Sequence, residues 1–305
     1  MRTKLGTVGF LILLTWAGWL WSAETPKKKN APPKVPDGVQ TLKDLAYVPG
    51  GHKQQRLDLY LPERRGGGPL PIVVYVHGGA WKAGDKAYCP ALWLATKGYA
   101  VASINYRLSQ DAVFPAQIQD CKTAVRWLRA HAKQYGLDPD RVAAWGGSAG
   151  GHLVALLATT TGKKEFEGDG DLDQSSRVQA VIDWYGPSDF VVLGAHEKSP
   201  TEPLSTLLGG LVSKNEAKAR WASPLTYVGK DAPPFLIVQG DQDPVVIPSH
   251  SQRLAEALNA AGVEVHLEML PGAKHGGLAF VTPERLKQIE DFLAKHLSTT
   301  GASGR

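Results

Sequence analysis

Short apolar runs alternate with amphipathic stretches along most of the chain. Residues 72–76 are continuously apolar, as expected of a strand that is covered on both faces. Residues 116–135 carry apolar side chains three and four positions apart, which predicts an amphipathic helix. Further strands are predicted at 99–104, 142–145, 178–184, 235–238 and 263–270, a half-buried strand at 55–61, and helices at 153–157, 249–261 and 283–296. The alternation predicts an α/β fold in which helices cover both faces of a mostly parallel central sheet.

Two segments interrupt this alternation. Residues 162–176 are polar, and their alternating aspartates resemble the start of a calcium-binding loop. Gln174 and Ala180 stand where such a loop needs glycine and glutamate, so we expect a solvated loop instead. Residues 189–227 are longer and irregular, with a short helical piece, and we expect a small cap-like insertion within a domain at 41–300.

The N-terminus has a different pattern from the rest of the chain. Basic residues, an apolar run at 8–21 and small residues follow one another, which predicts a signal peptide at 1–23 and a secreted or periplasmic protein. An uncleaved membrane anchor is the alternative, because the bulky Trp21 stands near the expected cleavage site. Residues 24–40 are rich in lysine and proline and are expected to form a flexible linker.

Composition and charge mainly exclude some classes of protein and partner. A hydrophobic fraction of 43% and a charged fraction of 21% exclude a disordered chain. The net charge is +5, but charges are dispersed beyond the linker, which argues against a nucleic-acid partner. Two cysteines, Cys89 and Cys121, are too few for a disulfide framework. Both are expected in helices, and we favour buried free thiols over a bridge.

The strongest chemical signal is the sequence Gly146-Gly147-Ser148-Ala149-Gly150, which matches the nucleophile-elbow pattern G-x-S-x-G. A predicted strand runs into it and a predicted helix leaves it, as this motif requires. Small neighbours are needed there because side chains would collide with adjacent strands. We therefore predict that Ser148 is a nucleophile, although a glycine-rich turn with a surface serine is the structural alternative.

A serine hydroxyl needs a base to take its proton. His275 lies in the loop after the strand at 263–270, where the order nucleophile, acid, base places the histidine. His266 lies within that strand and is expected to be structural. His275 is therefore the predicted base.

The acid is expected in the loop after the preceding strand. Asp241 and Asp243 both lie there, and we favour Asp243 because it is deeper in the loop and precedes a turn-fixing proline. Asp189 follows an earlier strand and is a third candidate. The chosen carboxylate would orient His275 and stabilise its protonated form.

The loop His77-Gly78-Gly79-Ala80-Trp81 follows the strand at 72–76 directly and corresponds to an oxyanion loop of the HGGG type. Glycines there let backbone N–H groups point at a substrate carbonyl. The predicted oxyanion hole consists of the amides of Gly79, Ala80 and Ala149.

Aromatic residues near strand ends are candidates for a substrate pocket. Trp81, Trp184 and Tyr185 lie near the carboxyl ends of predicted strands, where ligands bind in open α/β sheets. Core packing is an equal alternative for each of them. Trp145 precedes the elbow within a strand and is expected in the core.

Taken together, these motifs resemble the α/β-hydrolase superfamily. Within it, the chain is similar to the hormone-sensitive-lipase-like esterases, and more closely to their bifunctional feruloyl and acetyl-xylan esterase-like branch. The residues that carry the resemblance are His77 to Trp81, Asn105 to Leu108, Phe114 to Ala116 with Asp120, Gly146 to Gly150, Gly240 with Asp243, and His275 with Gly276. One departure is Ala80, which stands where the lipase-like group has a third glycine.

The resemblance implies a function and a mechanism. It implies a triad of Ser148, Asp243 and His275 and no cofactor or metal. The expected activity is a serine carboxylic-ester hydrolase that acts through an acyl-enzyme on short-chain or carbohydrate-linked esters. Tyr106, Arg107 and Asp120 are expected to brace the oxyanion loop.

Two alternatives to an esterase are retained. One is an exopeptidase or acylaminoacyl peptidase, which shares the sheet and triad. The other is a non-catalytic binding protein on the same scaffold. The expected partner is a small or polysaccharide-linked ester, with no stable membrane span once the signal is removed.

Overall fold

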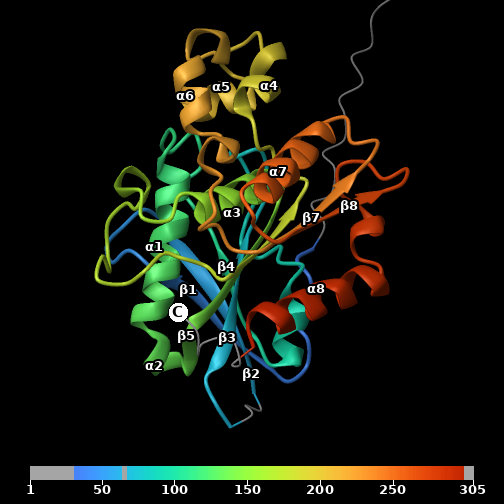
Figure 1. Ribbon diagram of the computed structural model, residues 1–305. Coiled ribbons are helices and arrows are strands. Elements are labelled where there is room, and N and C mark those ends of the chain that lie inside the picture. Colours follow the sequence, from blue (N-terminus) through green and yellow to red (C-terminus); the bar gives the residue numbers. More distant parts are fainter. Residues whose placement is uncertain (1–30, 64–66, 299–305) are drawn as a thin grey trace, which may run out of the picture. The chain divides into compact units, whose positions relative to one another are not determined.

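Eight strands form a single sheet in the computed structural model, in the order β1-β2-β4-β3-β5-β6-β7-β8 (Figure 1). The structure describes residues 31–63 and 67–298, so the expected signal peptide and the first part of the expected linker lie outside the described residues. The strands are β1 (Val39–Ala46), β2 (Arg56–Pro62), β3 (Leu70–Val76), β4 (Ala100–Ile104), β5 (Leu137–Gly147), β6 (Ala180–Trp184), β7 (Phe235–Gly240) and β8 (Val265–Leu270). Strand β2 runs antiparallel to both neighbours, and all other pairs are parallel. The prediction of a mostly parallel sheet is confirmed.

Helices cover both faces of this sheet. They are α1 (Ala116–Ala130), α2 (Ala132–Tyr135), α3 (Ala149–Thr159), α4 (Phe190–Leu193), α5 (Pro203–Leu208), α6 (Glu216–Trp221), α7 (Ser249–Ala260) and α8 (Pro283–His296). Helices α1, α3 and α7 contribute to the larger apolar core on one face. The 3₁₀ helix η1 (Leu92–Lys97) and α8 contribute to the smaller core on the other face.

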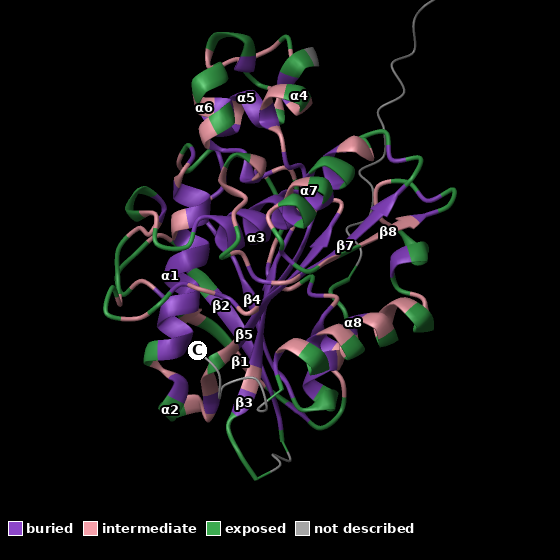
Figure 2. Ribbon diagram, viewed as in Figure 1, coloured by how far each residue is buried: buried purple, intermediate pink, exposed green. Residues whose placement is uncertain are grey.

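Strand β3 shows how the sequence produces these two cores. Its side chains alternate between the faces, so Ile72 and Val74 enter the larger core while Val73 and Tyr75 enter the smaller one. Because both faces are covered, the strand is almost entirely buried (Figure 2). This burial explains why its sequence is continuously apolar rather than alternating.

Three expectations about local structure are corrected. The helix expected at 116–135 is divided into α1 and α2, which are separated by His131. Strand β1 begins at Val39, inside the segment expected to be linker. Cys89 lies in a loop rather than a helix, although both cysteines are buried and free as expected.

The acidic segment at 162–176 is mostly exposed, as expected of a solvated loop, but it is anchored to the protein at two adjacent residues. Phe166 is fully buried, and Glu167 forms ion pairs with Lys122 at 2.7 Å and with Arg126 at 2.8 Å. Both cations are themselves buried on α1, so the loop neutralises charge that would otherwise be unpaired in the interior. Within the described ranges, no group of three acidic, histidine or cysteine residues is placed to hold a metal ion.

Residues 189–227 form the short helices α4, α5 and α6, joined by 3₁₀ turns and gathered at the top of Figure 1. They have buried apolar residues of their own, including Leu207 and Val212. Asp189 caps the first helix by accepting two backbone N–H groups, and its other oxygen pairs with Arg253 of α7 at 2.7 Å. No helix in the described part of the chain is long and apolar enough to cross a membrane.

Candidate active site

Ser148 lies at the sharp turn between β5 and α3. Its φ of 55° is in the left-handed region, which non-glycine residues rarely adopt. The turn needs glycine at neighbouring positions: a Cβ on Gly146 would lie 2.3 Å from the Gly150 carbonyl oxygen, and one on Gly150 would lie 2.1 Å from the Val76 oxygen. The Ser148 N–H donates to the carbonyl oxygen of Trp184 on β6 at 2.8 Å. The close packing of backbone on backbone therefore fixes this serine in its strained conformation.

Two short hydrogen bonds connect Ser148 to a histidine and a carboxylate. His275 Nε2 lies 2.9 Å from Ser148 Oγ, and His275 Nδ1 lies 2.6 Å from Asp243 Oδ2. When Nδ1–H donates to the carboxylate, Nε2 is left free to accept the serine proton. His266, the other histidine considered, is exposed on β8.

Asp243 is held by donors on both of its oxygens. Oδ1 accepts the backbone N–H groups of Val245 at 2.8 Å and Val246 at 3.0 Å. Oδ2 accepts the side-chain amide of Gln239 at 3.2 Å in addition to the histidine. The carboxylate is buried, so these bonds replace the water it has lost and fix its direction toward His275.

The other two candidate acids have structural roles. Asp241 is exposed and accepts the backbone N–H of Gly272 at 2.7 Å, which joins the loops after β7 and β8. Asp189 caps α4 and pairs with Arg253. Of the three aspartates, the structure brings Asp243 to the histidine.

The predicted oxyanion loop lies beside the elbow. A Cβ on Gly78 would lie 2.7 Å from the carbonyl oxygen of Gly147, so the loop and the elbow touch backbone to backbone. Gly79 and Ala80 have φ values of 114° and 53°, which turn the loop sharply after β3. In the described part of the chain, the amides of Gly79, Ala80 and Ala149 donate to no protein acceptor. They are therefore free to donate to a ligand.

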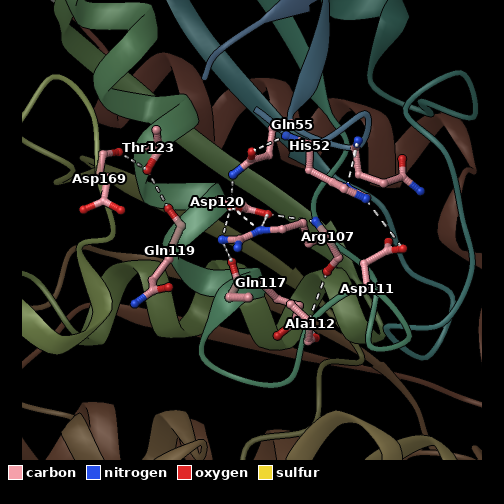
Figure 3. A network of polar contacts seen from close by, with 12 residues as sticks. His52, Gln55, Arg107, Asp111, Ala112, Gln117, Gln119, Asp120, Thr123 and Asp169 are labelled. Carbon is pink, nitrogen blue, oxygen red and sulfur yellow. Dashed lines mark hydrogen bonds and ion pairs between the residues drawn. The ribbon is translucent and has the colours of Figure 1, made fainter. Parts of the chain in front are cut away.

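Polar and aromatic side chains lie next to His77, the first residue of this loop. The ring of His77 stacks on Tyr106 with centroids 4.4 Å apart, and the Tyr106 hydroxyl donates to the His77 carbonyl at 3.0 Å. Next to it, Arg107 and Asp120 form an ion pair at 2.7 Å, and Asp120 also accepts a hydrogen bond from the side-chain amide of Gln55 (Figure 3). Tyr106 therefore contacts the loop directly, whereas the ion pair joins Arg107 to Asp120 of α1.

The three aromatic pocket candidates have different surroundings. Trp81 and Trp184 are buried in the two cores, as in the packing alternative. Tyr185 is partly exposed, and its ring lies 4.6 Å from that of His275 and 4.8 Å from that of Phe280. Burial raises the pKa of Tyr185 to about 12, so it presents a neutral phenol beside the catalytic candidates. Only Tyr185 is both beside the histidine and partly open.

Asp183 is a buried acid near the elbow that the sequence analysis missed. Its Oδ1 accepts the N–H of Gly186 at 2.9 Å, and its Oδ2 has no hydrogen-bond partner among the described residues. A Cβ on Gly151 of α3 would lie 2.3 Å from Oδ1, which places the carboxyl directly against the helix that leaves the elbow. Burial raises the pKa of Asp183 to about 7. An acid within an otherwise apolar strand was the signal in the sequence.

We expect the stability of Asp183→Asn, relative to that of the parent protein, to increase as the pH rises. The folded-state pKa of about 7 lies above the ordinary value of 3.8, so folding favours the neutral acid and this contribution is lost as pH rises through 7. Between pH 5 and pH 8 the difference in the free energy of unfolding should change by about 2–3 kcal/mol in favour of the variant. Urea unfolding at both pH values measures it. Asp241→Asn, at an exposed site, is the control, and parallel stability curves for Asp183→Asn and the parent would contradict the expectation.

Fold and site together define a class. A mostly parallel eight-stranded sheet that presents a serine at the turn after β5, hydrogen-bonded to a histidine and an aspartate from later strand ends, is the α/β-hydrolase fold. The chain belongs to the BD-FAE family, whose model matches residues 57–258. The resemblance seen in the sequence motifs is thereby confirmed.

Curated relatives come from bacteria and plants. "Esterase LipQ" of Mycobacterium tuberculosis is 33% identical over 263 residues, which cover 82% of this chain and 61% of that protein. "Isoprenylcysteine alpha-carbonyl methylesterase ICME" of Arabidopsis thaliana is 28% identical over 256 residues, covering 81% and 59%. The matches thus span about six-tenths of the length of these relatives.

Solved structures show the same architecture. A "truncated form of carbohydrate esterase from gut microbiota" has a TM-score of 0.79 and 31% identity, and the match covers 84% of this chain and 96% of that one. Esterase B from Lactobacillus rhamnosis has a TM-score of 0.72 and 28% identity, and the match covers 86% of each chain. The fold of the described domain is therefore shared with esterases over nearly its full length.

Proposed function

We propose that this protein is a serine carboxylic-ester hydrolase that acts through an acyl-enzyme. The observation that carries the proposal is the chain of hydrogen bonds from Ser148 Oγ to His275 at 2.9 Å and on to Asp243 at 2.6 Å. The relatives and structures named as esterases support the same chemistry.

Acylation begins when Ser148 Oγ attacks the ester carbonyl carbon while His275 Nε2 accepts the hydroxyl proton. The carbonyl oxygen becomes an oxyanion, which accepts hydrogen bonds from the amides of Gly79, Ala80 and Ala149. His275 then returns the proton to the departing alkoxide. The alcohol leaves, and the acyl group remains bonded to Ser148.

Deacylation repeats these steps with water. His275 takes a proton from water as the water oxygen attacks the acyl carbon, and the same three amides hold the second oxyanion. The Ser148–acyl bond breaks, the serine oxygen recovers its proton from His275, and the carboxylic acid leaves. Asp243 stabilises the imidazolium in both halves without taking its proton.

The proposed substrates are short-chain or carbohydrate-linked esters. The carbohydrate esterase among the similar structures supports this class. Tyr185 beside His275 is a candidate wall of the pocket for the acyl or alcohol group. The basic and apolar N-terminal pattern supports a secreted or periplasmic location, where polysaccharide-linked esters are accessible.

A panel of substrates tests the function. We expect hydrolysis of p-nitrophenyl acetate, with rates that fall as the acyl chain lengthens, and release of acetate or ferulate from acetylated xylan or methyl ferulate. Faster cleavage of a peptide p-nitroanilide than of every ester would instead assign a peptidase. Failure to turn over any ester above the rate of the Ser148→Ala variant would contradict the proposal.

A further inference from the structure

His152 connects three parts of the molecule one helical turn beyond Ser148. Its ring is fully buried, and each ring nitrogen makes one hydrogen bond. Trp81 Nε1 lies 3.2 Å from Nδ1, and the Ala222 carbonyl oxygen lies 2.8 Å from Nε2. The ring also stacks on Phe190 with centroids 4.3 Å apart. Trp81 belongs to the oxyanion loop, whereas Phe190 and Ala222 belong to the segment 189–227. One side chain thus joins the elbow helix, the oxyanion loop and the helical insertion.

The partners of His152 allow only one form of the imidazole. The indole N–H of Trp81 is a donor only, so Nδ1 must accept. The carbonyl of Ala222 is an acceptor only, so Nε2 must carry the hydrogen. A second proton on Nδ1 would face the indole N–H. In agreement, burial lowers the pKa of His152 to about 3, which keeps the ring neutral in the working pH range and excludes it as a base for Ser148.

The hydrogen bond from Trp81 matters because of the backbone to which that side chain is attached. Ala80 and Trp81 have consecutive positive φ values of 53° and 57°, a conformation that persists only where surrounding contacts enforce it. The Trp81 carbonyl accepts the N–H of Ser109 at 2.8 Å, and the indole is held by His152. The direction of the Gly79 and Ala80 amides therefore depends on both hydrogen bonds of Trp81.

We propose that His152 is a positioning residue, whose neutral ring fastens Trp81 to the insertion and thereby aims the amides of Gly79 and Ala80 at the substrate oxyanion. This role rests on the proposed esterase function. The same ring couples the insertion to the oxyanion hole, so a displacement of 189–227 at Ala222 would be transmitted to the amides through one hydrogen-bonded side chain. His152 does not touch the reacting atoms.

Three variants separate this role from simple packing. His152→Leu keeps a side chain of similar bulk but removes both hydrogen bonds. We expect its kcat for p-nitrophenyl acetate to fall about 10- to 100-fold and its KM to change less than about 3-fold. The loss falls on kcat because the oxyanion forms only in the transition state. His152→Gln can accept from the indole and donate to Ala222, so it should restore most of kcat. Trp81→Phe keeps an aromatic ring but removes the indole N–H, and it should lower kcat in the same way.

Two further measurements test whether His152 and Trp81 act through one hydrogen bond and on the oxyanion. The double variant His152→Leu/Trp81→Phe should lose no more activity than the more impaired single variant, because each single variant already removes the hydrogen bond between Trp81 and His152. Affinity for a trifluoromethyl ketone, which binds as an oxyanion, should fall in parallel with kcat. Trp127→Phe, a buried tryptophan on α1 away from the site, is the matched control and should keep the parent kcat.

The outcomes are separable. Unchanged kcat in Trp81→Phe, or equal losses in the leucine and glutamine variants with additive effects in the double variant, would overturn the positioning role. If His152→Leu does not fold, Trp81→Phe and His152→Gln still decide the question. An inactive parent protein would instead mean that the proposed esterase function has failed.

Discussion

Replacement of Ser148 by alanine is expected to lower kcat for p-nitrophenyl acetate by about 10⁴- to 10⁶-fold, since loss of a nucleophile or its base removes the acyl-enzyme route altogether. KM should change little, because the hydroxyl contributes to the reaction rather than to ground-state binding. The Ser148 side chain is bonded only to His275 in the described structure, so the variant should keep the fold and its thermal stability. Initial rates at saturating ester, corrected for the uncatalysed reaction, provide the measurement.

The matched control is Ser213→Ala, at an exposed serine of the insertion. It should retain the parent kcat. A Ser148→Ala protein that is folded and retains more than about a tenth of the parent activity would show that another group is the nucleophile.

The second large effect concerns the acid. Asp243→Asn is expected to lower kcat by about 10³- to 10⁴-fold, as loss of the orienting carboxylate does in serine hydrolases of other folds. The backbone N–H groups of Val245 and Val246 both point at Oδ1, so the amide oxygen of an asparagine should occupy that position. Its NH₂ group then faces His275 Nδ1. The imidazole is forced into the tautomer that carries hydrogen on Nε2, which cannot accept a proton from Ser148.

Asp241→Asn is the control for this experiment. An asparagine oxygen can still accept the N–H of Gly272, so kcat should stay within about threefold of the parent value. Kinetics of both variants on one ester are sufficient. A larger loss at Asp241 than at Asp243, or equal losses, would mean that the acid has been wrongly assigned.

The reaction centre could be predicted from sequence because its signals are local. Ser148 is surrounded by the glycines that its strained turn requires, and His275 and Asp243 follow predicted strands at the ends where an α/β sheet gathers its catalytic groups. The choice between Asp241 and Asp243 has no such local signal. It depends on which carboxylate receives the two backbone amides, and these are positioned only by the folded loop.

Features that depend on distant partners could not be predicted. Nothing in the sequence around His152 indicates its role, since its partners Trp81 and Ala222 lie 71 and 70 positions away. The ion pairs of Glu167 depend on Lys122 and Arg126, two buried cations of α1 that one helical turn brings together. Strand β1 was missed because its pairing shifts register between Leu42 and Leu45, which interrupts the alternation that would have revealed it.

The central claim is that Ser148 carries the acyl group, and peptide mapping by mass spectrometry after reaction with a fluorophosphonate tests it most directly. We predict one phosphonyl adduct per protein molecule, located on Ser148, with loss of ester hydrolysis in proportion to labelling. Ser148→Ala should remain unlabelled under the same conditions. Full inactivation with the adduct on another residue, or no adduct in a protein that hydrolyses esters, would contradict the account.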